Sequence, residues 1–406
     1  MKLPNPEGFI AFEINNNEFI NSYRKLSINN RINAVSNYLR ICKTLLLSGK
    51  SFSDYVRDIL IFSEQPLIEK YIRDGCENHR IYDAVCYDLN QIISICSTSS
   101  KDIKKYLSQS FNMDFSDLPE FESGKFDFDA EYFIESCKNN GCGIFAKYKA
   151  FLYNSNPPPA FDRSYLEKHL LPIEKPDPIK LSDLKHYEVQ RKQIINNTLS
   201  LINNRPACNV LLYGDRGTGK SSTVKALLNE FPALRMIQLE KNQIQSIFDL
   251  YRELEKIPLH FIIFIDDLCF SEDENGFTVL KQALEGSLAA RPQNVLIYAT
   301  TNRRHIIKET EANRADSYIH KSDAVDDNMS LSDRFGLFVT FMSPNKEQFT
   351  DIGLKIAHDR GIKTDKEQFS LGIERFALKK GGRSPRIAKQ YVDMLEGKIF
   401  PETDSL

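Results

Sequence analysis

At residues 214–221 the sequence reads Gly214-Asp215-Arg216-Gly217-Thr218-Gly219-Lys220-Ser221, which matches the phosphate-binding pattern GxxxxGK followed by Ser or Thr. The apolar run Val210-Leu211-Leu212-Tyr213 precedes this segment, and the helix-forming stretch 222–228 follows it. Its glycines let the backbone turn back with N–H groups pointing inward, and the following helix adds the positive end of its dipole. The segment therefore predicts a loop that binds the phosphates of a nucleoside triphosphate. The alternative, a chance match in a glycine-containing turn, is disfavoured by the flanking strand and helix.

The polar residues of this loop have expected roles. Lys220 is expected to reach the β- and γ-phosphates, and the Ser221 hydroxyl to ligate the Mg²⁺ that the phosphates carry. Thr218 and Ser222 are expected to be structural. The residues predicted to hold the nucleotide in the loop are Gly214, Asp215, Arg216, Gly217, Thr218, Gly219, Lys220, Ser221 and Ser222.

Composition limits the class of protein. With 406 residues, 41% of them hydrophobic, the chain can bury a full core and form two or three domains. A net charge of −2 excludes a strongly basic footprint over the whole chain but leaves a local basic patch open. No signal peptide opens the sequence, and the longest apolar run, at 261–265, is too short to cross a bilayer. We therefore expect a cytoplasmic protein without membrane contact.

The eight cysteines contain no CxxC pair and predict buried free thiols in a reducing cytoplasm. Cys137 and Cys142 are the only close pair in the sequence, and no histidine lies near them, which disfavours a zinc site.

Residues 1–140 predict a helical N-terminal domain, because apolar residues recur at helical spacing over 35–46 and again over 81–96. Three consecutive prolines at 157–159 cannot continue a helix or a central strand. Together with a second extended stretch at 171–178, they predict a linker over 141–180.

Beyond the linker, strands and helices alternate, which predicts an α/β fold. The expected strands are 209–213, 235–239, 260–266, 295–300 and 338–341, and the expected helices are 187–201, the one after the phosphate loop, 244–254 and 278–288. This alternation predicts a parallel sheet with helices on both faces, which we assign to 181–343. Three further helices, at 346–359, 366–378 and 385–395, predict a small helical bundle in 344–406.

Asp266 and Asp267 follow the apolar run 261–265, which is typical of a buried central strand. In open α/β sheets, ligands bind at the carboxyl ends of the strands. We expect Asp266 to hold Mg²⁺ through water and Asp267 to orient or deprotonate the attacking water. The alternative is a pair of turn or helix-capping aspartates, which the presence of the phosphate loop disfavours.

Polar residues near the next two strands extend the predicted site. Asn302 follows the fourth strand, and its amide can hold the attacking water as a neutral donor and acceptor; alternatively, it only forms a turn. Arg334, flanked by Phe335 and Gly336, is a candidate arginine finger that stabilises transition-state charge in a neighbouring subunit. The alternative is a solvated or core-paired arginine.

The last predicted helix supplies one more candidate. Ser384 is expected as its N-cap and Pro385 at its first position, which places Arg386 in the first turn. From there Arg386 can reach the γ-phosphate and couple the helical bundle to the nucleotide. Arg383 is the competing residue for this role.

These elements, in this order, make the chain similar to AAA+ ATPases. More narrowly, it resembles a bacterial family of predicted AAA+ ATPases that is catalogued only as a domain of unknown function. The resemblance runs through 143–148, 209–222, 266–268, 284–286, 298–305, 331–336 and 382–384. It implies a sensor-1 role for Asn302, an arginine finger at Arg334, a sensor-2 role for Arg386 and a C-terminal helical lid. It also implies ATP and Mg²⁺ as ligands and a homo-oligomer that forms on nucleotide binding.

Two positions depart from the AAA+ pattern. Most AAA+ proteins have Glu after the metal-binding Asp, whereas this chain has the shorter Asp267. Because a misplacement of about 1 Å can cost on the order of 10²-fold in rate, we expect slow turnover. His186 stands where a glycine is expected before the helix that backs the adenine. Selection of adenine over guanine rests on the resemblance and on the lack of an NKxD motif.

Three functions compete. The first is an ATPase, converting ATP to ADP and phosphate, that Arg334 completes in trans and that moves the N-terminal domain against a protein client. The second is a nucleotide-gated switch or adaptor that hydrolyses ATP rarely, which Asp267 favours. The third, with the least support, is a DNA-associated loader-like ATPase, based on the short basic runs at 303–305 and 379–380. Threading of polypeptides is disfavoured, because 240–245 lacks an aromatic-apolar-glycine loop, and 306–330 is expected to be a mobile insert near a subunit interface.

Overall fold

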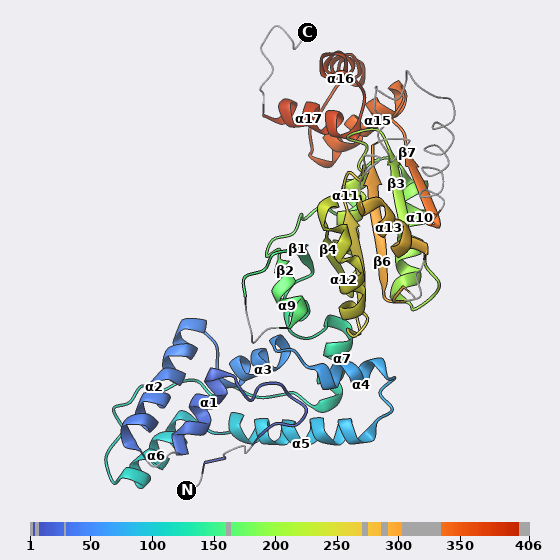
Figure 1. The fold of residues 1–406 in the computed structure, drawn as a ribbon. Helices are drawn as coiled ribbons and strands as arrows, with labels where there is room; N and C mark the ends of the chain where they lie inside the picture. The colour runs from blue at the N-terminus through green and yellow to red at the C-terminus, as the bar shows by residue number, and fades with distance from the viewer. Residues whose placement is uncertain are drawn as a thin grey trace. The chain divides into compact units, whose positions relative to one another are not determined.

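The computed structural model describes residues 3–4, 8–27, 30–159, 164–269, 275–285, 291–302 and 334–397. The chain forms two compact units, one of Met1–Tyr148 with Lys256–Leu259 and one of Lys149–Glu255 with His260–Leu406 (Figure 1). Among the described residues, no helix combines the length and the apolar character that crossing a membrane requires.

The first unit is helical, as its sequence predicts. Its elements are α1 (Glu18–Arg24), η1 (Lys25–Ser27), α2 (Arg31–Ser48), α3 (Phe52–Phe62), α4 (Pro66–Arg73), α5 (His79–Cys96), α6 (Ser100–Phe111), α7 (Ala130–Asn140) and α8 (Ile144–Lys147). An Asn, Ser or Asp side chain accepts a backbone N–H in the first turn of α1, α2, α3, α5, α6 and α7. These helices therefore begin where the sequence supplies an N-cap.

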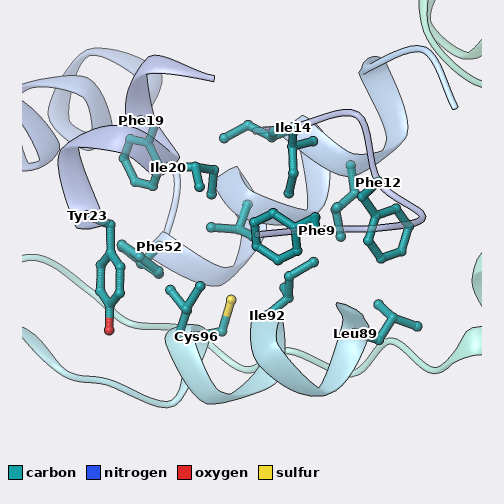
Figure 2. Packing of buried hydrophobic residues seen from close by; sticks show 14 of the residues in the cluster. Phe9, Phe12, Ile14, Phe19, Ile20, Tyr23, Phe52, Leu89, Ile92 and Cys96 are labelled. Carbon is teal, nitrogen blue, oxygen red and sulfur yellow. The ribbon is translucent and has the colours of Figure 1, made fainter. Parts of the chain in front are cut away.

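A segment without regular secondary structure, at residues 8–14, packs on α5 in the core of this unit (Figure 2). The buried carboxylate of Asp88 in α5 holds it, because Oδ2 accepts the backbone N–H groups of Ile10, Ala11 and Phe12 at 2.8, 2.6 and 3.1 Å. One acidic side chain thereby satisfies three consecutive backbone donors inside an apolar core.

The second unit contains a sheet of seven strands in the order β2-β1-β4-β5-β6-β3-β7. The strands are β1 (Ala150–Tyr153), β2 (Leu170–Pro172), β3 (Val210–Gly214), β4 (Leu234–Gln238), β5 (His260–Ile265), β6 (Val295–Thr301) and β7 (Leu337–Phe341). All neighbours pair in parallel except β1 and β2, which are antiparallel. The five predicted strands are present, with ends that differ by at most one residue from the prediction.

The prediction of a linker over 141–180 is wrong, because α8, β1, α9 (Tyr165–His169) and β2 all lie in that segment. β1 pairs with β4, and β2 pairs with β1, so both extend the sheet at one edge. They are four and three residues long, which is too short for a clear periodic pattern. Pro172 is tolerated because β2 is an edge strand.

Helices cover both faces of the sheet, as predicted. They are α9 (Tyr165–His169), η2 (Leu181–Asp183), α10 (Glu188–Ile202), α11 (Lys220–Glu230), η3 (Lys241–Ser246), α12 (Ile247–Leu254) and α13 (Asn275–Glu285). Every residue of β5 from Phe261 to Ile265 is at most 1% exposed, so the side chains on both faces of this strand are buried. Residues of α10 and α11, among them Ile194 and Val224, pack in one cluster with alternate residues of the strands.

Three helices form the C-terminal bundle: α15 (Lys346–Asp359), α16 (Lys366–Lys380) and α17 (Pro385–Glu396). They pack around a separate apolar cluster that includes Phe349, Phe369 and Tyr391. Ser384 is the N-cap of α17 and Pro385 its first residue, as the sequence predicts. The bundle is the helical lid that the resemblance implies.

Candidate functional site

The phosphate loop joins the end of β3 to the start of α11, and its three glycines adopt conformations that favour glycine. Gly214, Gly217 and Gly219 have φ values of 141°, 77° and 99°. A Cβ atom on Gly214 would lie 1.9 Å from the carbonyl oxygen of Phe341, so the close approach of β7 also requires glycine there. The loop therefore has the backbone geometry that the sequence predicts.

Lys220 begins α11 and is almost completely buried. Its Nζ donates to the carbonyl oxygens of Gly214 and Asp215 and to Oδ1 of Asn302, each at 2.8 Å. Burial lowers the pKa of Lys220, and the carboxylates of Asp215, Asp267 and Asp266 oppose that change. The ammonium group thus lies between the loop and the carboxyl end of β6.

Asp266 follows β5, and its Oδ1 accepts hydrogen bonds from two hydroxyl groups. Ser221 Oγ donates at 2.6 Å and Thr300 Oγ1 at 2.5 Å. The predicted metal ligands, Ser221 and Asp266, are therefore adjacent and present the oxygen donors that Mg²⁺ prefers. This donor set fits a magnesium ion carried by a nucleotide.

Asn302 follows β6 and lies between Lys220 and Asp267. Its Nδ2 donates to Oδ1 of Asp267 at 2.7 Å while its Oδ1 accepts from Lys220. The structure thus brings together the four side chains that the sequence assigns to phosphate binding, metal binding, water activation and water positioning: Lys220, Asp266, Asp267 and Asn302. Asp267 has a φ of 53°, a left-handed conformation that is uncommon for a residue with a Cβ atom.

Two contacts connect the phosphate loop to the lid. The backbone N–H of Arg386 donates to the carbonyl oxygen of Gly217 at 3.2 Å. Oδ2 of Asp215 accepts from the backbone N and the Oγ of Ser343, at 2.8 and 2.7 Å, just before the lid begins. These bonds lower the pKa of Asp215. No sequence pattern predicts the contact between Asp215 and Ser343.

The two candidate sensor-2 residues differ in position. Arg386 lines the cavity described below. Arg383 instead forms a two-pronged ion pair with Glu374 of α16, with its Nε and Nη2 between 2.8 and 3.2 Å from the carboxylate oxygens. Only Arg386 of this pair is therefore among the residues that face the phosphate loop.

Arg334 forms an ion pair with Glu285 at the end of α13, in the same chain. It is not among the described residues that line the cavity. Within one chain, Arg334 is therefore a paired arginine, which is the alternative that the sequence left open. A role as an arginine finger would be exerted in a neighbouring chain. Three features of the sequence analysis lie outside the described residues. They are part of the resemblance (residue 286), the basic run at 303–305 and the expected insert, which falls within 306–333.

A cavity of about 950 Å³ joins these groups. Its lining includes residues 216–222 of the phosphate loop, Asp266, Asp267, Asn302 and Arg386. It also includes the apolar side chains of Ile179, Leu184, Tyr187, Ile352 and Ile356. The cavity therefore offers polar groups suited to phosphates and apolar side chains suited to a base.

The turn before α10 adopts an unusual backbone conformation. His186 and Tyr187 have φ values of 69° and 65°, both in the left-handed region. This conformation favours the glycine that is expected at position 186, at a cost of roughly 1–2 kcal/mol for a residue with a Cβ atom. The Tyr187 hydroxyl donates to the carbonyl oxygen of Met342 at 2.5 Å, which fixes the ring at the cavity wall.

A protein-family model with the description "Protein of unknown function (DUF815)" matches residues 158–399, which is more than half of the chain. The chain belongs to this family. Its parallel sheet, its phosphate loop and its C-terminal helical bundle also confirm the AAA+ fold that the resemblance implies.

Solved structures to which the chain is similar include three variants of RuvB from Thermotoga maritima. They share 14%, 16% and 16% identity with this chain, with TM-scores of 0.39, 0.37 and 0.38. Each match covers 54% of this chain and 65% of the RuvB chain. No curated protein matches the chain.

Proposed function

We propose that this protein binds ATP with Mg²⁺ and hydrolyses it slowly to ADP and phosphate. One observation carries the proposal. Lys220, Asp266, Asp267 and Asn302 come from the phosphate loop and from the ends of two neighbouring strands, and all four line one cavity. Asn302 bonds to both Lys220 and Asp267, and Asp266 bonds to Ser221 of the loop. Phosphate binding alone does not require a carboxylate bonded to an amide, whereas hydrolysis uses such groups to position and activate the attacking water.

The loop residues bind the triphosphate in this proposal. Backbone N–H groups of 215–221 and the N-terminus of α11 receive the phosphates. Lys220 Nζ exchanges its bonds to Gly214, Asp215 and Asn302 for bonds to phosphate oxygens. The Ser221 hydroxyl and the Asp266 carboxylate hold Mg²⁺, which neutralises phosphate charge when bound.

Asp267 and Asn302 act on the attacking water. Once Lys220 bonds to phosphate, Oδ1 of Asn302 becomes able to accept a hydrogen bond from that water. Asp267 takes the water proton as the new O–P bond forms and the bond between the γ-phosphorus and ADP breaks. Asn302 keeps Asp267 in place through its N–H group.

The apolar side chains of the cavity lining receive the base. Tyr187, Ile352 and Ile356 provide the surface for a flat ring. The choice of adenine follows from the family resemblance. Arg386 then contacts the γ-phosphate and, through the bond of its backbone N–H to Gly217, couples the lid to the nucleotide.

Arg334 completes the site of a neighbouring subunit in a homo-oligomer that forms on nucleotide binding. Its ion pair with Glu285 keeps the guanidinium within its own chain until a neighbour with bound nucleotide attracts it. Movement of the lid is transmitted to the N-terminal helical unit and from there to a protein client.

The test compares Lys220→Ala with Lys225→Ala, which removes a lysine from the same helix but outside the cavity lining. Binding of Mg·ATP is measured by titration calorimetry and turnover by phosphate release. Lys220→Ala is expected to abolish both, and Lys225→Ala to leave both unchanged. Unaltered Mg·ATP binding by Lys220→Ala would show that the loop is not the nucleotide site.

A nucleotide-gated switch is the second candidate. It is favoured by the hydrogen bonds of the Asn302 side chain, whose oxygen accepts from Lys220 and whose nitrogen donates to Asp267. If that arrangement persists with ATP bound, the site holds the nucleotide without activating water. The comparison of wild type with Asp267→Glu, described below, separates the two candidates.

A further inference from the structure

We propose that Thr300 is a positioning residue that sets both acidic side chains of the site. This inference rests on the proposed binding of Mg·ATP and its hydrolysis, and it concerns a residue that neither the phosphate loop nor the acidic pair includes. Thr300 lies near the end of β6 and is 2% exposed. Its role would be exerted through Asp266 and Asp267, not by contact with the nucleotide phosphates.

Thr300 bonds to three consecutive residues after β5. Its Oγ1 donates to Oδ1 of Asp266 at 2.5 Å and accepts the backbone N–H of Asp267 at 2.9 Å. Its carbonyl oxygen accepts the backbone N–H of Leu268 at 2.7 Å. The hydroxyl has a single proton, which it donates in the hydrogen bond to the Asp266 carboxylate. A lone pair on its oxygen therefore accepts the backbone N–H of Asp267. Both hydrogen-bonding functions of this hydroxyl therefore serve the acidic pair.

The strand ladder does not extend to these residues. The register of the parallel β5–β6 pair ends with Ile265 opposite Ala299. Asp266 and Asp267 lie beyond that last pair, so bonds from Thr300 replace the ladder where the acidic side chains begin. The hydroxyl of Thr300 thus holds the start of the turn, and its backbone carbonyl group holds the next residue.

The left-handed backbone conformation of Asp267 needs the hydrogen bonds from Thr300. Its φ of 53° is disfavoured for a residue with a Cβ atom and persists only where surrounding bonds hold it. In this conformation its carboxylate reaches Asn302 at 2.7 Å. A glutamate could bring its carboxylate into place by rotating its longer side chain. Aspartate has one methylene fewer, so the backbone itself must place its carboxylate. Thr300 therefore allows an aspartate to occupy the position of the expected glutamate.

The experiment uses Thr300→Val, which keeps nearly the same shape but removes the hydroxyl, and Thr300→Ser, which restores it. Thr301→Val is the control, because Thr301 is equally buried on the same strand and, by strand alternation, faces the other side of the sheet. All are made in the full chain. For each variant, kcat and KM for ATP are measured, together with the Kd for ATP at several Mg²⁺ concentrations and the thermal midpoint.

Thr300→Val is expected to lower kcat by on the order of 10- to 100-fold, as misplacement of a catalytic group does. KM is expected to change by less than about threefold, since the loop contacts remain. The Mg²⁺ concentration needed for tight ATP binding should rise, because Asp266 loses one of the two hydroxyls that orient it. Thr300→Ser should recover kcat to within about threefold of wild type, and Thr301→Val should retain it even if its thermal midpoint falls.

The inference is overturned if Thr300→Val keeps wild-type kcat and Mg²⁺ dependence, or if Thr300→Ser loses as much as Thr300→Val. Absence of turnover in the wild type would instead contradict the proposed hydrolysis. In that case the Mg²⁺ dependence of ATP binding still decides the role of Thr300. A Thr300→Val variant with unchanged Mg²⁺ dependence would then end the inference.

Discussion

The side-chain amide of Asn302 donates to the carboxylate of Asp267 across 2.7 Å. The two residues follow neighbouring strands, β6 and β5, and are far apart in the sequence. The amide also accepts a hydrogen bond from Lys220 on its oxygen side. Asn302 therefore links Lys220, for which we propose phosphate binding, to Asp267, for which we propose activation of water.

Replacing Asn302 should slow hydrolysis without preventing ATP binding. Asn302→Ala removes both the group that holds Asp267 and the acceptor for the attacking water, and the expected loss in kcat is on the order of 10²-fold. The Kd for Mg·ATP should change by less than about threefold, because the loop bonds remain. Asn203→Ala, at an exposed position after α10, is the matched control. An equal loss of ATP binding and turnover would indicate that Asn302 has only a structural role.

Asp267→Glu should not accelerate turnover by more than about threefold. The left-handed backbone already brings the shorter carboxylate into contact with Asn302, so the additional methylene has no gap to fill. Asp267→Asn, which keeps the shape and removes the basic oxygen, should lower kcat by at least about 10²-fold. Phosphate release under saturating Mg·ATP measures both. A large gain in Asp267→Glu would favour the nucleotide-gated switch, in which the site is built to hold ATP.

Much of this site could be predicted from the sequence because its signals are local. The phosphate loop is a contiguous pattern between an apolar strand and a helix, and Asp266 follows five buried residues of β5. Parallel strands present their carboxyl ends at one edge, which placed Asn302 beside Asp267 without any knowledge of their distance.

The remaining features depend on contacts between distant segments. Asp215 bonds to Ser343, and Thr300 bonds to Asp266 and Asp267. Nothing in the sequence around Ser343 or Thr300 indicates these contacts. β1 and β2 are too short to show periodicity, and they become strands because β4 offers an edge with which β1 can pair. A buried hydroxyl group or an edge strand meets its partner only after the chain has folded, so the local sequence does not indicate the contact.

Arg334 and Glu285 provide a test of assembly. Arg334→Ala should lower turnover by ~10³-fold or more while leaving the Kd for ATP unchanged, because a finger acts on the transition state of a neighbouring site. Glu285→Gln removes the carboxylate that Arg334 contacts in its own chain, so turnover per subunit should rise at protein concentrations where wild type is not fully assembled. Activity is measured over a range of protein concentrations, with solution mass determined with and without ATP. Wild-type turnover in Arg334→Ala would rule out the shared site.

The N-terminal unit should lose stability as pH rises, because of a buried carboxyl group in α4. Glu69 is 8% exposed, and burial, reinforced by Glu64 and opposed by Arg73, raises its pKa to about 7. In the unfolded chain the pKa of a glutamate is about 4.3. The folded state therefore binds more protons between these two values, and the free energy of unfolding contributed by Glu69 falls as pH rises from about 4.3 through about 7.

Glu69→Gln removes this titration and should make the unit more stable than wild type at about pH 8, by on the order of 2 kcal/mol, with little difference at about pH 5. Urea unfolding, followed by circular dichroism across this pH range, measures the effect. Glu77→Gln is the control, since Glu77 is an exposed glutamate of the same unit. If wild type and Glu69→Gln have parallel stability profiles, the carboxyl group of Glu69 is not desolvated in the folded protein, and the packing of α4 against α7 must admit water.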